Sequence, residues 1–374
     1  MSWPMVALGE ISQQIRGVTY EKSDAKPIAA DGYEMLLRAN NITDDGIIFE
    51  DVVYVPSGRV NRKQVLTEHD IVIAASSGSL KVVGKSATFR GGPRVTFGAF
   101  CKAIRPDTAK VDPRFFSHVF RTPDYRRHVE RRAAGANINN LRNEDIAEYE
   151  IPLPSLEEQR RIAGILDAAD ALRRRRREAL ALLDTLPGAI FAEMFGDYKN
   201  DRHSWETVSF SDACIDRTSR SPKVKARDYC SIGKLPVVDQ GAALIAGFVD
   251  NLDMENVSPL PVVIFGDHTR HVKLVDFPFA TGADGAKVLE PGNGFIAEYL
   301  AECIRALPLP DLGYSRHMRE LKRLEFPKPP VDQQMTFARQ VACINEQRHQ
   351  YERDIQELET LFASLQSRAF AGEL

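Results

Sequence analysis

Two long stretches of this chain carry apolar residues at alternating steps of four and three. Such steps keep the residues on one side of an α-helix and are typical of the seam of a coiled coil. In the later stretch the seam positions are Phe337, Val341, Ile344, Arg348, Tyr351, Ile355, Leu358, Phe362 and Leu365. In the earlier stretch they are Ile162, Leu166, Ala169, Arg173, Arg176, Leu180, Leu183, Pro187 and Ile190. The pattern predicts two long helices with an arginine at the same seam position.

Each helix is expected to have about 30 residues and to be about 45 Å long, which is more than one globular region can cover. We therefore expect the helices to pack antiparallel about an approximate two-fold axis and to hold two globular regions apart. The alternative is that each helix covers its own domain. Ser155 and Glu158 predict a capping box, whereas Pro187 predicts a break or kink. The arginine run at 173–177 fits a solvated helix face or contact with a phosphate backbone.

The helical stretches are two copies of one segment. Residues 151–197 and 326–374 align without a gap at an offset of 175 residues, and the matched pairs include Pro152 with Pro327, Pro154 with Pro329, Gln159 with Gln334 and Phe195 with Phe370. Upstream, the segments that begin at the two tryptophans, Trp3 and Trp205, also match. The intervening regions are much less similar. Such a duplication predicts a repeated scaffold that carries two different binding surfaces.

The predicted organisation is α+β. We expect mixed α/β domains at residues 1–150 and 198–325, and helical regions at residues 151–197 and 326–374. An apolar run at residues 70–79 ends in small polar residues, and residues 261–270 occupy the corresponding place in the second copy. Strands that end in this way place hydrogen-bonding side chains on exposed loops.

Charge and cysteine content narrow the class of protein. Between Lys81 and Arg142 there are fourteen Lys or Arg against four Asp or Glu, which marks a candidate polyanion-binding face or an ordinary solvated surface helix. The five cysteines are widely spaced and form no C-x-x-C pair, which favours a reducing cytoplasm and disfavours a zinc site. No apolar run approaches the roughly 20 residues of a membrane span, and the N-terminus lacks a signal pattern. We expect a cytoplasmic protein.

Few residues suggest catalysis. Asp267, His268 and His271 could ligate a metal, but no further clustered ligand is evident, so contact with a base or phosphate, or a structural turn, is favoured. The chain has no Walker loop, no G-x-S-x-G, no Rossmann fingerprint and no adenine-methyltransferase motif. A binding protein is therefore favoured over an enzyme.

The repeated motifs resemble a known family. A Trp-led segment, a Pro-x-Pro segment and an acidic residue followed by Glu or Gln and Gln at the start of a long helix all occur twice, most distinctly in "IPLPSLEEQRRIAGILDAAD". This combination resembles the specificity subunit of type I restriction-modification systems. The segment "FGDHTRHVKLVDFPFATGADGAKVL" is similar to one class of target recognition domain in that family.

The resemblance implies a function in DNA recognition. Each target recognition domain would read one half of an asymmetric, split site in double-stranded DNA, with the helices as a spacer. Two methyltransferase subunits would dock on the chain and methylate adenine with S-adenosylmethionine, and restriction subunits would add ATP-driven translocation and cleavage. The chain itself would bind no cofactor or metal and perform no catalysis.

The resemblance does not identify the residues that contact bases, so candidates come from side-chain chemistry. Arg, Lys, Asn, Ser, Thr, Tyr and His on loops between apolar runs can bind base edges or phosphates. In the first domain the candidates are Arg59, Arg62, Lys63, Ser76, Ser77, Ser79, Lys81, Asn137, Asn139 and Asn140. In the second domain they are His268, Thr269, Arg270, Lys273, Tyr314, Arg316 and His317.

Two other classes of function remain as alternatives. The chain could be a self-contained enzyme that modifies or cleaves DNA, which turnover by the chain alone would reveal. It could also be a coiled-coil interaction protein that does not bind DNA. Salt-dependent retention on duplex DNA distinguishes that class, because phosphate contacts weaken steeply with salt.

Overall fold

The computed structural model describes residues 3–133, 139–198, 205–220, 222–283, 285–313 and 315–374. These residues form two compact units. The first unit contains residues 1–177 and 353–374, and the second contains residues 178–352. Each unit therefore combines a globular part with one segment of each of two long helices.

The two long helices are longer than predicted. α5 (Leu156–Phe195) has 40 residues and α9 (Val331–Ala371) has 41 residues, compared with the expected 30 or so. Pro187 lies inside α5, and the predicted break there is wrong. A proline removes one backbone donor, and here the helix after it is held by the packing of Phe191 and Phe195 in the core of the second unit. Gly196 and Gly372, with φ of 99° and 76°, follow the last residues of the two helices.

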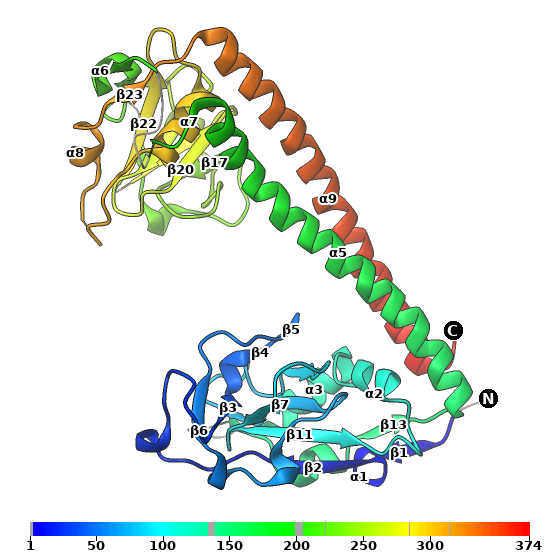
Figure 1. The fold of residues 1–374 in the computed structure, drawn as a ribbon. Coiled ribbons are helices and arrows are strands. Elements are labelled where there is room, and N and C mark those ends of the chain that lie inside the picture. The colour runs from blue at the N-terminus through cyan, green and yellow to red at the C-terminus, as the bar shows by residue number, and fades with distance from the viewer. Residues whose placement is uncertain (1–2, 134–138, 199–204, 221, 284, 314) are drawn as a thin grey trace. The chain divides into compact units, whose positions relative to one another are not determined.

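The predicted helix seam is confirmed. Every seam position is buried or half-buried. In the first unit Arg173 on α5 pairs with Glu359 on α9, while Arg176 pairs with Asp354, so these helix segments run antiparallel (Figure 1). In the second unit Phe191 of α5 contacts Phe337 of α9. Because both helices enter the core of each unit, the alternative of one helix per domain is wrong.

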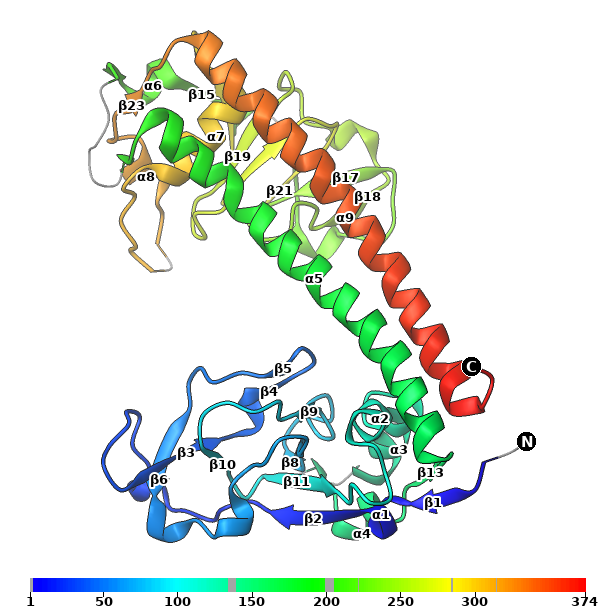
Figure 2. The ribbon, with the colours of Figure 1, turned by 45° about the vertical axis from the view of Figure 1, so that its right-hand side comes forward.

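The globular part of the first unit is built on two main sheets. The four-stranded antiparallel sheet has the order β2-β11-β7-β9, and the three-stranded sheet has the order β10-β3-β6, in which β10 and β3 are parallel. Helices α2 and α3 pack between these strands and the start of α5 (Figure 2). The elements are β1 Met5–Ala7, α1 Leu8–Ile11, β2 Ser12–Arg16, β3 Tyr33–Leu37, β4 Ile42–Thr43, β5 Gly46–Ile47, β6 Val53–Pro56, β7 Ile71–Ala74, β8 Ser76–Ser77, β9 Ser86–Thr88, β10 Val95–Phe97, β11 Cys101–Pro106, α2 Pro113–Val119, α3 Pro123–Ala133, β12 Asn139–Asn140, α4 Asn143–Ala147 and β13 Glu150–Pro152.

The second unit repeats this arrangement. Its antiparallel sheet has the order β15-β22-β19-β20, and its other sheet has the order β16-β21-β17-β18, in which β21 and β17 are parallel. The elements are β14 Thr207–Val208, α6 Phe210–Ala213, β15 Cys214–Asp216, β16 Lys223–Val224, β17 Leu235–Val238, β18 Gly247–Val249, β19 Val262–Gly266, β20 Val272–Val275, β21 Ala280–Gly282, β22 Ala286–Pro291, α7 Ala297–Ala306, α8 Met318–Leu321 and β23 Phe326–Pro327.

The apolar runs predicted as buried strands are β7 and β19. Every residue of both strands is buried, and each strand is third in the order of its antiparallel sheet. A run that is apolar at consecutive positions suits a strand covered on both faces. The predicted correspondence between the two runs is confirmed.

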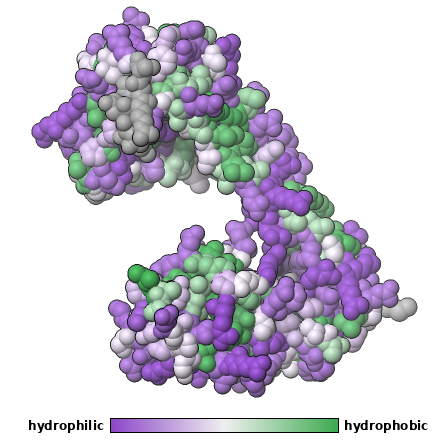
Figure 3. Space-filling view, in the orientation of Figure 1, coloured by the Kyte–Doolittle hydropathy of each residue, from purple (hydrophilic) through white to green (hydrophobic). Residues whose placement is uncertain are grey.

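In the space-filling view the surface is mainly polar with scattered apolar patches (Figure 3).

A buried glutamine explains the repeated Pro-x-Pro and Gln motif. The Gln159 side chain donates to the Pro154 carbonyl at 2.8 Å and accepts from the Asp112 N–H at 2.7 Å. In the second unit Gln334 donates to the Pro329 carbonyl at 2.8 Å and accepts from the Ile296 N–H at 3.1 Å. Asp112 and Ile296 precede the first residues of α2 and α7. Each glutamine therefore links the start of a long helix to the start of a domain helix.

The Trp-led segments complete the repeated scaffold. β1 pairs with β13 and β14 pairs with β23, so each Trp-led segment lies beside the strand that leads into Pro-x-Pro. Val6 opposes Ile151, and Val208 opposes Phe326. At the start of α5 the Glu158 N–H donates to Ser155 Oγ at 3.3 Å, while the Glu158 carboxylate pairs with Arg161. The sequence identity between the copies thus maps onto the same backbone pairings.

Candidate nucleic-acid interface

In the first unit, loops that leave three strands lie together. Because β3 and β10 are parallel and Leu37 opposes Phe97, both strands end at the same edge. The Gly98 N–H, after β10, donates to the Leu37 carbonyl at 2.9 Å. The Ala75 N–H, after β7, donates to the Phe100 carbonyl at 2.8 Å. Side chains on these loops are therefore anchored to a rigid sheet, which suits a recognition surface.

Two groups of predicted residues meet at this edge. Ser76 and Ser77 form β8, which pairs antiparallel with β12: Ser77 opposes Asn139, and Ser76 opposes Asn140. The two serines are half-buried and Asn140 is exposed. Asn137 lies outside the described residues. Ser76 and Ser77 thus share one short strand pair with residues that are distant in sequence.

The basic candidates of the first unit lie on other segments. Arg62 and Lys63 are exposed on a 3₁₀ turn, Arg62–Gln64. Arg59 is exposed and pairs with Asp24 at 3.1 Å. Ser79 and Lys81 are exposed in the loop that follows β8. The structure therefore divides these candidates between the strand-end loops and separate surface turns.

A pocket beside the strand-end loops contains residues that were not among the candidates. It has a volume of about 790 Å³ and is lined by Val18, Tyr20, Arg38, Asn40, Ser76 and Phe100, among others. Arg38 and Asn40 directly follow β3, and Phe100 is 69% exposed. The rule that selected Ser76, an apolar strand that ends in polar residues, would also have selected Arg38 and Asn40 in "YEMLLRAN".

In the second unit the loops after β17 and β19 are joined by side chains. The His268 N–H donates to Gln240 Oε1 at 3.2 Å, and Thr269 Oγ1 donates to the Gln240 carbonyl at 2.5 Å. The His268 ring contacts the Ser315 carbonyl at 3.2 Å. His268, Thr269 and Arg270 are half-buried. These residues occupy the place that Ser76 and Ser77 hold in the first unit.

Two candidates of the second unit are buried. His317 is fully buried, and its Nδ1 lies 3.0 Å from the Asp267 carbonyl. Lys273 is 6% exposed and its ammonium donates to the Asp239 carbonyl at 2.7 Å. Burial lowers the pKa of Lys273, although Asp239 opposes that shift. Because neither side chain reaches solvent, we assign them to positioning the loops rather than to base contact.

The remaining candidates of the second unit differ in exposure. Arg316 is exposed. Arg270 has a positive φ of 60° and pairs with Asp311 at 2.7 Å. Tyr314 lies outside the described residues. Arg316 is therefore the basic side chain of this set that is most open to a ligand.

The residues considered for metal binding form no metal site. Asp267 accepts from the Met318 N–H at 2.7 Å and lies 3.5 Å from the Lys287 ammonium. Among the residues that the structure describes, no group of three His, Cys, Asp or Glu side chains could hold a metal ion. Asp267 thus acts as an acceptor that fixes the segment before α8.

The basic stretch of the first unit is mostly neutralised. Ten of its fourteen basic residues form ion pairs: Lys85, Arg90, Arg94, Arg105, Lys110, Arg114, Arg121, Arg126, Arg127 and Arg132. Arg105 pairs with fully buried Asp70 at 2.6 Å. Most of these charges are therefore paired within the unit, and whether the stretch binds a polyanion stays a prediction.

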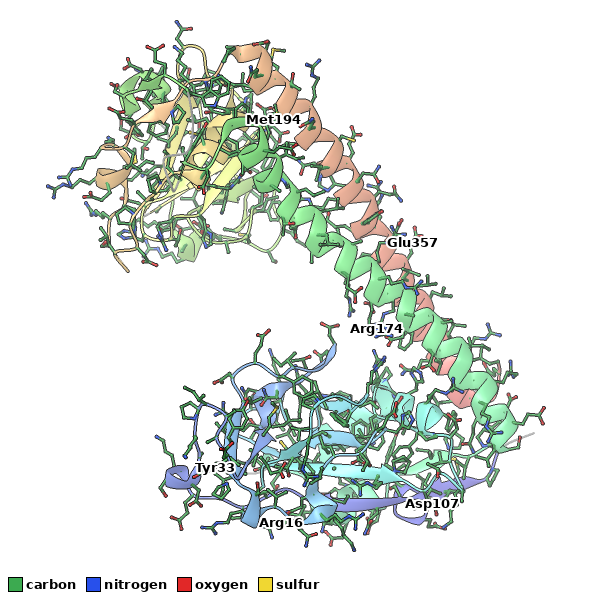
Figure 4. The ribbon with its side chains drawn as sticks, viewed as in Figure 1. Arg16, Tyr33, Asp107, Arg174, Met194 and Glu357 are labelled. Carbon is green, nitrogen blue, oxygen red and sulfur yellow. The ribbon has the colours of Figure 1, made fainter. Side chains whose placement is uncertain are left out.

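The arginine run of α5 is also an internal feature. Arg173 is buried, pairs with Glu359 and lies 4.2 Å from the centroid of the Phe362 ring. Arg174 and Arg177 pair with Asp170 and Asp45. Figure 4 shows Arg174 on α5 and Glu357 on the adjacent stretch of α9. The prediction of a simple solvated face is wrong, because these arginines join α5 to its neighbours.

Asp170 is the centre of this arginine cluster. Burial raises the pKa of the Asp170 carboxyl. Two hydrogen bonds from Arg121 and the charges of Arg121, Arg173 and Arg174 together lower this pKa by more than burial raises it. The net pKa of Asp170 is therefore below its ordinary value. The carboxylate stays ionised at neutral pH and offsets the repulsion among the arginines.

Comparisons with known proteins identify the N-terminal half. The family model described as "Type I restriction modification DNA specificity domain" matches residues 2–181. The chain is 41% identical over 165 residues to the StySPI specificity subunit of Salmonella potsdam, and 40% identical over 165 residues to the EcoKI specificity subunit of Escherichia coli. Each match covers 44% of this chain and 35% of the relative, so the match spans about a third of those proteins.

More distant matches extend over the whole chain. The putative MjaX specificity subunit of Methanocaldococcus jannaschii is 21% identical over 382 residues, which cover 92% of this chain and 87% of that protein. The crystal structure of a type I restriction-modification S subunit from M. genitalium has a TM-score of 0.58 at 16% identity, and covers 99% of this chain and 96% of that chain. A structure from work on assembly of the type I R-M system has a TM-score of 0.56 at 17% identity, and covers 100% and 98%.

These matches confirm two predictions from the sequence. The resemblance to type I specificity subunits is confirmed, and the fold shared with the solved S subunits confirms the α+β class with long helices. The names of the relatives agree with a specificity subunit rather than an enzyme. None of the described helices is long and apolar enough to cross a membrane.

Proposed function

We propose that this chain is the DNA-binding specificity subunit of a type I restriction-modification complex and reads a bipartite, asymmetric site in double-stranded DNA. One observation carries the proposal. The two units keep the same scaffold contacts, through Gln159 and Gln334, but differ in the loops at equivalent strand ends. A shared scaffold with different loops suits one task performed on two different half-sites.

The recognition domains in this proposal are residues 1–150 and 198–325. Residues 151–197 and 326–374 form the helical spacer. The chain works in the cytoplasm, where its DNA lies, and performs no chemistry itself. The strand-end loops Ser76–Ser77 and Asn139–Asn140 read one half-site, and His268, Thr269 and Arg316 read the other.

Two adenine methyltransferase subunits are the proposed partners, with restriction subunits as further partners. The support comes from equivalent exposed positions at the starts of both long helices. Glu157 and Arg161 on α5 match Asp332 and Thr336 on α9, and all four are exposed. Two similar patches can bind two copies of one partner. Measuring the mass of the saturated complex tests this, and one partner per chain would contradict it.

An exchange of recognition domains tests the proposed function. Residues 203–325 are replaced by the corresponding segment of another specificity subunit, and the methylated sites of the host genome are mapped. We expect one half of the site to change and the other half to persist. A change in both halves would contradict the assignment of one domain to each half-site. Methylation or cleavage by the purified chain alone would favour a self-contained enzyme instead.

A further inference from the structure

The pocket at the strand-end loops of the first unit contains an arginine in a fixed orientation. Arg38 Nη2 donates to the Asp51 carbonyl at 2.7 Å and to Asp51 Oδ2 at 2.9 Å. Both hydrogens of Nη2 are therefore engaged. The Arg38 Nε is buried without a hydrogen-bond partner. Asp51 thus holds the guanidinium in one orientation, with Nη1 left to donate to a ligand.

Asp51 also orients Asn40. The Asn40 Nδ2 donates to Asp51 Oδ2 at 3.1 Å, which turns the amide so that Oδ1 remains an acceptor. One carboxylate therefore positions a cationic donor and a neutral acceptor side by side. Asp51 has a positive φ of 51°, a conformation that asparagine and aspartate tolerate better than most residues.

The pocket beside these groups is apolar. Val18 and Val53 line it together with Tyr20, and Phe100 stands at its edge with 69% of its surface exposed. Phe100 therefore presents an aromatic face to solvent beside the guanidinium of Arg38 and the amide of Asn40. Lys22 and Lys26, which are exposed, also line the pocket and give it a positive rim.

We propose that Arg38, Asn40 and Phe100 form a base-reading element of the first unit, with Asp51 as its positioning residue. This inference rests on the proposed function. An adjacent donor and acceptor complement a major-groove edge that offers an acceptor beside a donor, such as O6 of guanine with N4 of its cytosine, or N7 with N6 of adenine. Phe100 packs on the thymine methyl group of a neighbouring pair.

The opposite end of the same strands supplies a matched control. Arg94, just before β10, pairs with Glu34 of β3 through two contacts of 2.9 Å. This pair has the same chemistry as Arg38 with Asp51. It lies at the start of the parallel strands rather than at their end, and it should not touch the same DNA edge.

Selection from a randomised duplex DNA library tests the proposal. The full chain is isolated from its host with its bound partner subunits, and sequences enriched by the wild type, Arg38→Ala, Phe100→Ala and Arg94→Ala are compared. We expect Arg38→Ala to lose discrimination at one position of one half-site and to bind the wild-type sequence about tenfold or more weakly. Phe100→Ala should relax an adjacent position. Arg94→Ala should enrich the wild-type sequence.

The variant Asp51→Asn separates positioning from folding. Asparagine preserves the backbone conformation but weakens the hold on Arg38, and it removes a negative charge from the interface. Discrimination at the Arg38 position should fall while affinity for unrelated DNA stays equal or rises. A merely structural role would weaken binding to all sequences together.

The outcomes distinguish this inference from the proposed function. If the wild type enriches a bipartite sequence and Arg38→Ala enriches the same sequence with unchanged affinity, the inference is wrong and the proposed function stands. Uniform weakening over all sequences by Arg38→Ala would make Arg38 a phosphate contact and also overturn the inference. If the wild type enriches no sequence, the proposed function itself fails.

Discussion

The two units share the hydrogen bonds that join each long helix to its domain, but they differ in the charged residues of the helix seam. In both, a buried glutamine at the start of a long helix bonds a proline carbonyl and the backbone ahead of a domain helix. At the seam of the first unit, however, Asp170 and Glu359 surround Arg173, whereas the matched residues in the second unit are Asn345 and Asp184. The comparison shows that the two copies keep the glutamine hydrogen bonds that join each long helix to its domain. The seam charges and the loops differ between the copies.

The largest expected effect tests whether the two glutamines are equivalent. Gln159→Leu leaves the Asp112 N–H and the Pro154 carbonyl without their partner, and Gln334→Leu does the same to the Ile296 N–H. Two unsatisfied buried groups should lower the free energy of unfolding of the affected unit by about 2 to 5 kcal/mol. Hydrogen exchange of peptides from α2 measures the stability of the first unit, and exchange of peptides from α7 measures the stability of the second.

Gln347→Leu is the control for this pair, because Gln347 is exposed on α9. It should change protection little. If only one of the two buried substitutions weakened its own unit, the equivalence of the glutamines would be refuted.

The second prediction contrasts the two seam arginines. Arg173→Met keeps the aliphatic stem but removes the pair with Glu359 and the contact with Phe362. We expect a loss of about 1 to 3 kcal/mol, because Arg177 still pairs with Glu359 and Arg121 with Asp170. Arg348→Met should be close to neutral, because the Arg348 Nε is buried without a partner. Denaturant unfolding of both variants checks this, and equal losses would contradict it.

The third prediction concerns the loops. His268→Ala should weaken binding by about 1 kcal/mol through the second half-site alone, because His268 lies in the loop that follows β19. Ser76→Ala should affect the first half-site alone. Binding to duplexes that are mutated in one half-site at a time shows which half-site each substitution affects. An effect of either substitution on both half-sites would contradict the assignment of loops to half-sites.

The smallest effect is a difference in acid sensitivity. The folded-state pKa of Asp170 is lowered, so its contribution to stability is present above its unfolded pKa, about 3.9, and is lost as pH falls through the folded value. Asp170→Asn makes the first copy like the second at this place. The variant should be less stable than the wild type at pH 7, and the difference should shrink in acid. A difference that stayed constant from pH 7 to acid would exclude this role.

Much of the fold was predictable because it depends on local patterns. The seam from Ile162 to Ile190 and its copy specified two helices, and consecutive apolar residues specified β7 and β19. The break predicted at Pro187 was wrong, because packing of the last turns of α5 in the second unit overrides the local preference of one residue. The glutamine motif was visible in the sequence, but its role was not, since its partners at Asp112 and Ile296 are distant in the chain.

The candidate interface was less predictable than the fold. Ser76 and Asn140 were selected for their chemistry, and only β8 and β12 place them side by side. His317 and Lys273 have suitable chemistry but are buried, and Lys273 lies within β20 rather than on a loop; burial cannot be deduced from residue type alone. The rule that selected Ser76 also fits Arg38, but the orientation of Arg38 was not predictable, because it depends on Asp51, which lies beyond β4 and β5.

The interleaved make-up of the first unit bears on its synthesis by the ribosome. Its core joins Leu166 to Phe362 and Ala369, which lie in the segment that follows the whole second unit. At about 5 to 20 residues per second, roughly 10 to 35 seconds pass between translation of residue 177 and residue 353. During that interval the apolar side of the early half of α5 lacks its cover from α9. The first domain to emerge is thus the last to be completed, and nascent chains that stall in this interval expose that apolar side to chaperones and proteases.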